Sequence, residues 1–149
     1  MRSREELFLT SASVLGMLGA MAMGVSACGP SQERVEADRV ITAINRLRDA
    51  PPEPLASREA LLAELERVSA TSPPAAKARD ACARAYRLLI EGKRLTEKVA
   101  AQLADPKSLT LEVGRELALA ESKITESAAA MPACETAVAD LRRPGAAGR

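Results

Sequence analysis

Two segments decide the fold: PPAAKARDACARAYRLLIEGKRLTEKVAAQLA at residues 73–104 and SLTLEVGRELALAESKITESAAAMPACETAVADL at residues 108–141. Each carries small or apolar residues at alternating spacings of four and three, which is the heptad seam of a left-handed helix pair. The first seam consists of Ala78, Cys82, Ala85, Leu89, Gly92, Thr96, Val99 and Leu103. The second consists of Val113, Leu117, Ala120, Ile124, Ser127, Met131, Cys134, Val138 and Leu141. The pattern predicts two long helices packed as an antiparallel hairpin.

The two cysteines of these seams set the register of the hairpin. Folding the segments back about Ser108 places Cys82 and Cys134 in one layer, whereas heptads alone would tolerate a slip of one repeat. We predict a Cys82–Cys134 disulfide; the alternative is that both are small buried apolar residues with free thiols. Pro132 has no backbone N–H to donate, so we expect the last helix to kink or break after about Ala128.

Prolines divide the preceding sequence into two more segments, for which the apolar spacing predicts helices at 32–49 and 58–70. Ser31, Ser57 and Ser72 stand where helix N-caps belong. We expect these helices to dock on the flanks of the hairpin, through Ala81, Leu88, Leu95, Leu111 and Leu119. The predicted fold is all-α: an antiparallel up-down four-helix bundle with a long disulfide-linked helical hairpin, over residues 32–142. A disordered tail would follow at 143–149.

The N-terminal segment predicts export. Residues 1–27 combine a short charged start with an apolar stretch of Leu, Ala, Met, Gly and Val. The segment ends in Val25-Ser26-Ala27-Cys28, which resembles the lipobox of bacterial prolipoproteins. The resemblance covers positions 1–28 and implies that 1–27 is a signal peptide, cut before Cys28, and that Cys28 receives the lipid. Residues 28–31 would then be the lipid anchor and a short tether.

Three other interpretations of this segment remain open. Leu7 to Ala27 approaches the length of an uncleaved membrane-spanning anchor. Ordinary signal peptidase could cut at the same small residues and release an unlipidated protein. A buried cytosolic helix is the third interpretation. In enterobacterial lipoproteins an Asp directly after the lipidated Cys retains the protein in the inner membrane. This chain has Gly29 at that position, so the resemblance favours the outer membrane, with the domain facing the periplasm.

The composition excludes most catalytic chemistry and nucleic-acid binding. The chain has 149 residues and no His, so imidazole bases and His metal ligands are absent. Its 21 Lys and Arg balance 20 Asp and Glu, which leaves no basic excess to neutralise phosphates. No nucleophile motif, phosphate loop or C-x-x-C stands in the sequence. We therefore expect no enzyme activity, no cofactor and no metal. Met131 could offer its sulfur to a metal ion, but no second soft ligand is available if the cysteines are bonded.

A basic stripe on residues 73–104 is the candidate interaction surface, through Arg84, Arg87, Arg94 and Lys98, with Tyr86 as a possible anchor. Residues 108–141 carry an acidic counterpart at Glu112, Glu116, Glu121 and Glu126. The alternatives are a solvated outer face for the charges and the edge of the core for Tyr86. Gly92 inside a helix is explained by close approach of Ile124 across the seam.

Two functions remain compatible with the sequence. The first is a membrane-anchored envelope lipoprotein whose non-catalytic helical domain is a structural or protein-interaction module for another envelope protein. The second is a carrier that binds a small apolar or amphipathic ligand inside the bundle. Small seam residues would line its cavity, namely Ala85, Gly92, Thr96 and Ala120.

Overall fold

A computed structural model describes residues 31–104 and 111–143, and within these ranges all regular structure is helical. The helices are α1 (Gln32–Asp49), α2 (Leu55–Arg67), α3 (Pro73–Leu103) and α4 (Leu111–Arg142). The predicted all-α class is confirmed. The predicted start of the last helix at 108 lies outside the described residues, as does the tail from 144 onward.

The prediction for the second helix is wrong by three residues at each end. Helix α2 starts at Leu55, and its N-cap position is Pro54, so Ser57 lies in the first turn and donates its N–H to the Pro54 carbonyl. The start is shifted because the Leu55 side chain is buried in the core. The chain reaches Leu55 through a cis peptide bond between Glu53 and Pro54.

The other two caps stand at the predicted positions. The hydroxyl oxygen of Ser31 accepts a hydrogen bond of 3.3 Å from the backbone N–H of Arg34, which caps α1. Ser72 is the N-cap residue of α3, with Pro73 in the first turn. The Ser72 side chain makes no capping bond, however.

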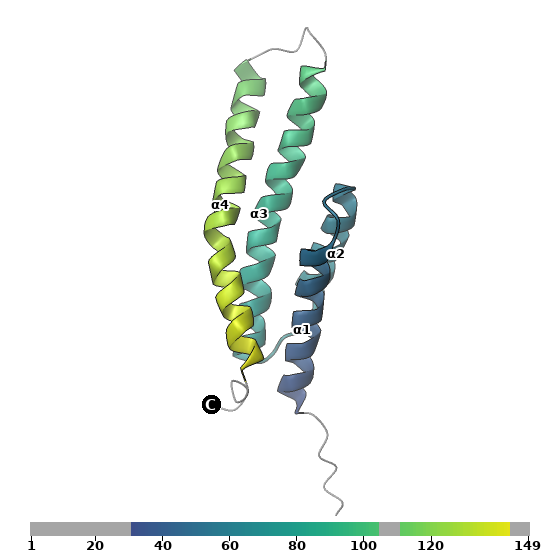
Figure 1. The fold of residues 1–149 in the computed structure, drawn as a ribbon, viewed down its shortest axis with the longest axis vertical. Coiled ribbons are helices and arrows are strands. Elements are labelled where there is room, and N and C mark those ends of the chain that lie inside the picture. The colour runs from purple at the N-terminus through teal and green to yellow at the C-terminus, as the bar shows by residue number, and fades with distance from the viewer. Residues whose placement is uncertain (1–30, 105–110, 144–149) are drawn as a thin grey trace, which may run out of the picture.

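Two helical hairpins of unequal length make up the fold (Figure 1). Helices α3 and α4 form the long one, and at 31 residues α3 is about 46 Å long. Helices α1 and α2 form the short one, and at 18 residues α1 is about 27 Å long. The short hairpin lies beside the half of the long hairpin where α3 begins and α4 ends. The other half extends beyond it.

The hydrophobic core lies in the half that all four helices share. Its α1 and α2 residues include Val40, Ile44, Leu47, Leu62 and Leu65. Helix α3 contributes Ala75, Ala78, Cys82, Ala83, Tyr86 and Ile90, and α4 contributes Cys134, Ala137 and Val138. Four helices with many alanines can approach closely, which compensates for the shortage of aromatic residues.

The predicted docking flanks are partly wrong. Leu111 is 75% exposed and Leu119 48% exposed. Both belong to the first turns of α4, whereas the short hairpin lies beside the half where α4 ends. On α3, Leu88 and Leu95 are only half-buried, and Ala81 packs against the edge of the core. Tyr86 and Ile90 provide the main α3 contribution instead.

The predicted disulfide and register are confirmed. Cys82 and Cys134 are bonded, with their Cα atoms 4.5 Å apart. One layer further on, the Ser127 hydroxyl donates a 2.8 Å hydrogen bond to the Ala85 carbonyl. Gly92 faces Ile124 so closely that a Cβ atom on Gly92 would lie 2.7 Å from Ile124 Cγ1. The absence of a side chain at position 92 therefore permits the close approach of α3 and α4.

Of the kink or break expected in the last helix after about Ala128, the break does not occur. Helix α4 continues to Arg142 with Pro132 inside it. The disulfide at Cys134 and the buried side chain of Val138 hold the turns beyond the proline against the core. The Thr136 hydroxyl donates a 2.8 Å hydrogen bond to the Pro132 carbonyl, one turn back along the helix.

Candidate functional site

The predicted lipidation residue, Cys28, lies outside the described residues, as do the predicted signal peptide and most of the predicted tether. The remaining candidate is the basic stripe of α3. Three of its basic residues form ion pairs within the chain, Arg84 forms none with the described residues, and the neighbouring Tyr86 is buried.

Three of the four basic residues of the stripe join helices within the chain. Arg87 donates two hydrogen bonds to one carboxylate oxygen of Glu66 on α2, at 3.2 and 2.6 Å. Arg94 forms a similar ion pair with Glu59 on α2. Lys98 forms an ion pair with Glu116 on α4, which raises the pKa of the lysine. These side chains hold α2 and α4 to α3, so the stripe is not a free cationic surface.

Arg84 has a different environment. It is exposed and makes no ion pair or hydrogen bond with the described residues. It borders a groove of about 400 Å³ between α3 and α4, whose other lining residues are Ala81, Glu126, Ala129, Ala130 and Ala133. Within the described chain, Arg84 is thus the one member of the predicted basic stripe that is available to a partner.

Tyr86 is buried and does not anchor an interface. Its side chain is part of the core, and the residue is only 6% exposed. Burial raises the pKa of its hydroxyl, against the opposing effect of the positive charge on Arg58. The alternative interpretation, in which Tyr86 lies at the core, agrees with the structure.

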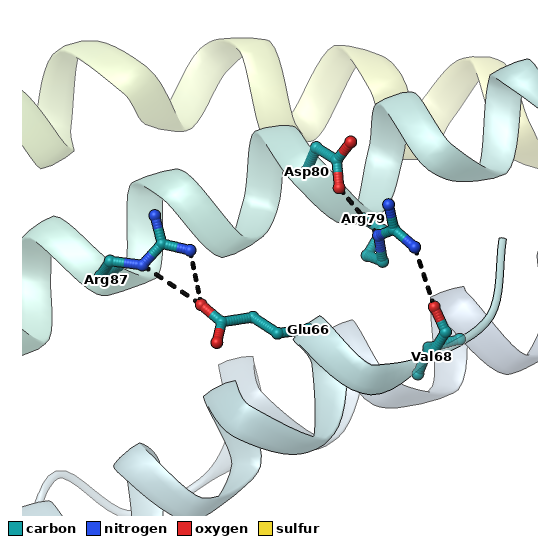
Figure 2. Close-up of polar contacts among 5 residues, drawn as sticks. All are labelled: Glu66, Val68, Arg79, Asp80 and Arg87. Atoms are coloured by element: carbon teal, nitrogen blue, oxygen red, sulfur yellow. Dashed lines mark hydrogen bonds and ion pairs between the residues drawn. The ribbon is translucent and has the colours of Figure 1, made fainter.

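A groove of about 380 Å³ between α2 and α3 is lined by charged residues (Figure 2). Arg79 lies between the Asp80 carboxylate, at 2.8 Å, and the Val68 carbonyl, at 3.0 Å. Val68 is the C-cap residue of α2, so Arg79 satisfies a carbonyl group at the helix end, where cations are favourable. Arg87 and Glu66 close the other end of the groove. The bonds from Arg79 to Val68 and from Arg87 to Glu66 both join α3 to α2, so the charged side chains around the groove connect the two helices.

Glu36 on α1 makes the most unusual polar contact in the described chain, and sequence reasoning missed it. It is only 3% exposed. Its carboxylate accepts hydrogen bonds from the Thr71 hydroxyl (2.5 Å), the Thr71 N–H (3.0 Å) and the Ser72 N–H (2.9 Å). These bonds, the one from the Thr71 hydroxyl above all, lower the pKa of Glu36 from 4.5 to about 2. Glu36 thereby fixes the start of α3 to α1.

The pKa of Glu36 predicts how stability depends on pH. Because the folded-state pKa lies below the unfolded value, Glu36 stabilises the fold above about pH 4.5 and loses this effect as pH falls towards 2. We expect Glu36→Gln to lower the urea midpoint at pH 7 and to lose its difference from the wild type near pH 2. The control is Asp38→Asn, which should follow the wild-type curve because Asp38 is exposed, two residues further along α1 and on the other side of the helix. If the urea midpoints of the wild type and of E36Q differ by the same amount at every pH between 2 and 7, the lowered pKa of Glu36 is contradicted.

Three of the four residues expected to line a ligand cavity are used for close packing instead, and the fourth, Thr96, is exposed. Ala85 and Ala120 are buried, and a Cβ atom on Gly92 would lie 3.1 Å from the Ala120 carbonyl oxygen. Thr96 is exposed and donates its hydroxyl to the Gly92 carbonyl. A groove of about 410 Å³ between α1 and α2 is spanned by the Arg46–Glu64 ion pair. None of these contacts favours a carrier.

In the described ranges, no cluster of three or more Cys, Asp or Glu residues is arranged to hold a metal ion. No helix of residues 31–104 and 111–143 is long and apolar enough to cross a membrane. Comparison with known protein families, characterised proteins and solved structures found no match.

Proposed function

We propose that the chain is a bacterial envelope lipoprotein, anchored in the membrane through lipid on Cys28, whose non-catalytic helical domain is a structural or protein-interaction module. The Cys82–Cys134 disulfide is the observation that carries the proposal. Such bonds persist in oxidising compartments, the destination of an exported protein, and are rare in the bacterial cytosol. The lipobox at Val25-Ser26-Ala27-Cys28 then specifies the form of export.

The position of the anchor defines the orientation of the domain in this proposal. Only Gly29, Pro30 and Ser31 separate Cys28 from α1, a tether too short to carry the domain far from the bilayer. Helix α1 begins at the end of the long hairpin opposite the one where α3 ends and α4 starts (Figure 1). The short hairpin would therefore lie at the membrane, and the free half of the long hairpin would be available to an envelope protein. Gly29 favours the outer membrane, with the domain in the periplasm.

We further propose that the four helices form one antiparallel up-down bundle, in which the disulfide-linked hairpin is the longer pair of helices. The shared core of α1 to α4 supports this interpretation. So do the ion pairs of Arg46 with Glu64 and of Arg87 with Glu66, which connect α1 to α2 and α3 to α2.

The lipid anchor is tested by the intact mass of the membrane-extracted protein and by Cys28→Ala. The expected wild-type mass is that of Cys28–Arg149 plus acyl groups, with two thiols that react only after reduction. The variant should lose the acyl mass, because no thiol remains at position 28 to carry the lipid. Ala27→Ser, a small-for-small exchange, is the control and should keep the acyl mass. A mass starting at Met1, or an unlipidated mass starting at Cys28, would contradict the proposal.

A further inference from the structure

One side of the α3–α4 hairpin carries two open grooves. The groove of about 400 Å³ beside Arg84 is one, and the other, of about 290 Å³, is lined by Pro73, Pro74, Lys77, Ala137 and Asp140. Most of the lining residues repeat at spacings of four and three, which places them in one row on each helix. The α3 row runs from Pro74 through Lys77 and Ala81 to Arg84, and the α4 row from Glu126 through three alanines to Asp140. The two rows are here called the open face.

The short hairpin packs against other sides of α3 and α4. Ala81 lies about 160° around α3 from Ala83, which is a core residue. Ala133 lies about 160° around α4 from Met131, which packs against the core. Helices α1 and α2 therefore leave the open face uncovered.

The two edges of the open face carry opposite charges. Lys77 and Asp140 line one groove, and Arg84 and Glu126 line the other, so each cation lies at the same height along the hairpin as a carboxylate. The two cations form no ion pair with the described residues. Within the described chain, the two carboxylates are bound only by residues three or four positions away in the sequence. The α3 edge is thus basic, the α4 edge is acidic, and the two are not paired with each other.

We infer that the open face binds the open face of a second copy of this chain, with the two long hairpins parallel and related by a two-fold axis along their length. This rotation places α3 of one copy opposite α4 of the other and keeps every residue at its height. Lys77 then faces Asp140 of the second copy, and Arg84 faces its Glu126, twice in the contact. Neighbouring helices run antiparallel throughout, so the two long hairpins form a four-helix bundle.

The open face is large enough for a stable contact. On α3 the row continues beyond Arg84 at the same spacing with Leu88 and Leu95, which are half-buried. From Pro74 to Leu95 the face is about 32 Å long, and two helices side by side are about 20 Å wide. Two such faces would bury about 1,300 Å² between them, within the range of specific protein interfaces.

The charges and the position of α1 both favour the parallel direction. In antiparallel copies the two basic edges would lie on each other, and so would the two acidic edges. In parallel copies α1 begins at the same end of both hairpins (Figure 1), so two lipid anchors on Cys28 would reach one membrane. The inference goes beyond the proposed function and holds whether or not Cys28 carries lipid.

Sedimentation of the full chain in a mild detergent, over a range of concentrations, tests the dimer. We expect the wild-type mass to double as the concentration rises. Arg84→Glu should raise the dissociation constant at least about tenfold, because it places two carboxylates opposite each other twice in the contact. Lys93→Glu is the matched control, because Lys93 is an exposed cation of α3 without an ion pair in the described chain, about 180° around the helix from Arg84.

Two results of this experiment would overturn the inference. One is a wild-type chain that stays monomeric at hundred-micromolar concentrations, and the other is an equal effect of R84E and K93E. Either result would leave the open face to a helix of another protein.

Exchange of the two charges tests the pairing. The double variant Arg84→Glu/Glu126→Arg restores opposite charges across the contact, so its dissociation constant should return close to that of the wild type. A double variant that dimerises as weakly as Arg84→Glu alone would overturn the inference.

Oxidative cross-linking tests the direction. Chains with Lys77→Cys and chains with Asp140→Cys, mixed and allowed to exchange subunits, should give a disulfide-linked dimer on a non-reducing gel. Each variant alone should give none above the wild-type background, because α3 lies opposite α4 of the other copy. Cross-linking of Lys77→Cys chains with each other would place α3 on α3 and overturn the parallel arrangement.

Discussion

Loss of the Cys82–Cys134 disulfide is expected to lower the free energy of unfolding by about 4 kcal/mol, because the closed loop restricts the unfolded chain. The two cysteines are 52 residues apart in the sequence. A small domain has a total stability of about 5–15 kcal/mol, so the loss is a large fraction of it. Urea unfolding followed by circular dichroism, with and without reductant, measures the effect on the wild type and on Cys82→Ala/Cys134→Ala.

The double variant is also the control for the reductant. Because its core cysteines are absent, the reductant should leave its urea midpoint unchanged, while the wild-type midpoint should fall close to that of the variant. A small difference between the reduced wild type and the variant is expected from the two side chains, which are both buried. Oxidised and reduced wild type with the same midpoint would show that loop closure does not stabilise this fold.

The features that could be predicted from sequence are those that one segment or one aligned pair determines. Heptad spacing within 73–104 and 108–141 is a local property, and the cysteines added the single long-range constraint that sets the register. Gly92 opposite Ile124 followed from that register. Serines before helices were also informative at Ser31 and Ser72, where they occupy the predicted N-cap positions.

The features that were missed depend on where separate segments meet. Glu36 looks like any helical carboxylate until the folded chain brings Thr71 and Ser72 to it. The sequence of α3 alone predicts an exposed stripe that includes Arg87 and Arg94. It does not show that Glu66 and Glu59 of α2 lie next to these arginines in the folded chain. Leu119 was assigned to a docking flank because periodicity shows which residues are apolar but not how far a short hairpin reaches.

The second large effect concerns the two glycines inside helices, for which we expect opposite results. Gly92→Ala should destabilise the protein by up to about 2 kcal/mol: overpacking costs about 1–3 kcal/mol, and the gain in helix propensity offsets about 1 kcal/mol of it. Gly114→Ala should stabilise it by up to about 1 kcal/mol, because a Cβ there meets no atom within 4 Å. Urea unfolding at low protein concentration measures both variants.

The cause of the Gly92 effect can be separated by a double-mutant cycle with Ile124→Ala. A Cβ on residue 92 meets Ile124 Cγ1 at 2.7 Å and the Ala120 carbonyl oxygen at 3.1 Å. Removing Cγ1 relieves the shorter contact, so Gly92→Ala should cost less in the Ile124→Ala background than in the wild type, and the two effects should not add. If the two effects add, the destabilisation by Gly92→Ala comes from the backbone contact with Ala120. Glycine would then be required at position 92 because the two helix backbones are close, and not because of the Ile124 side chain.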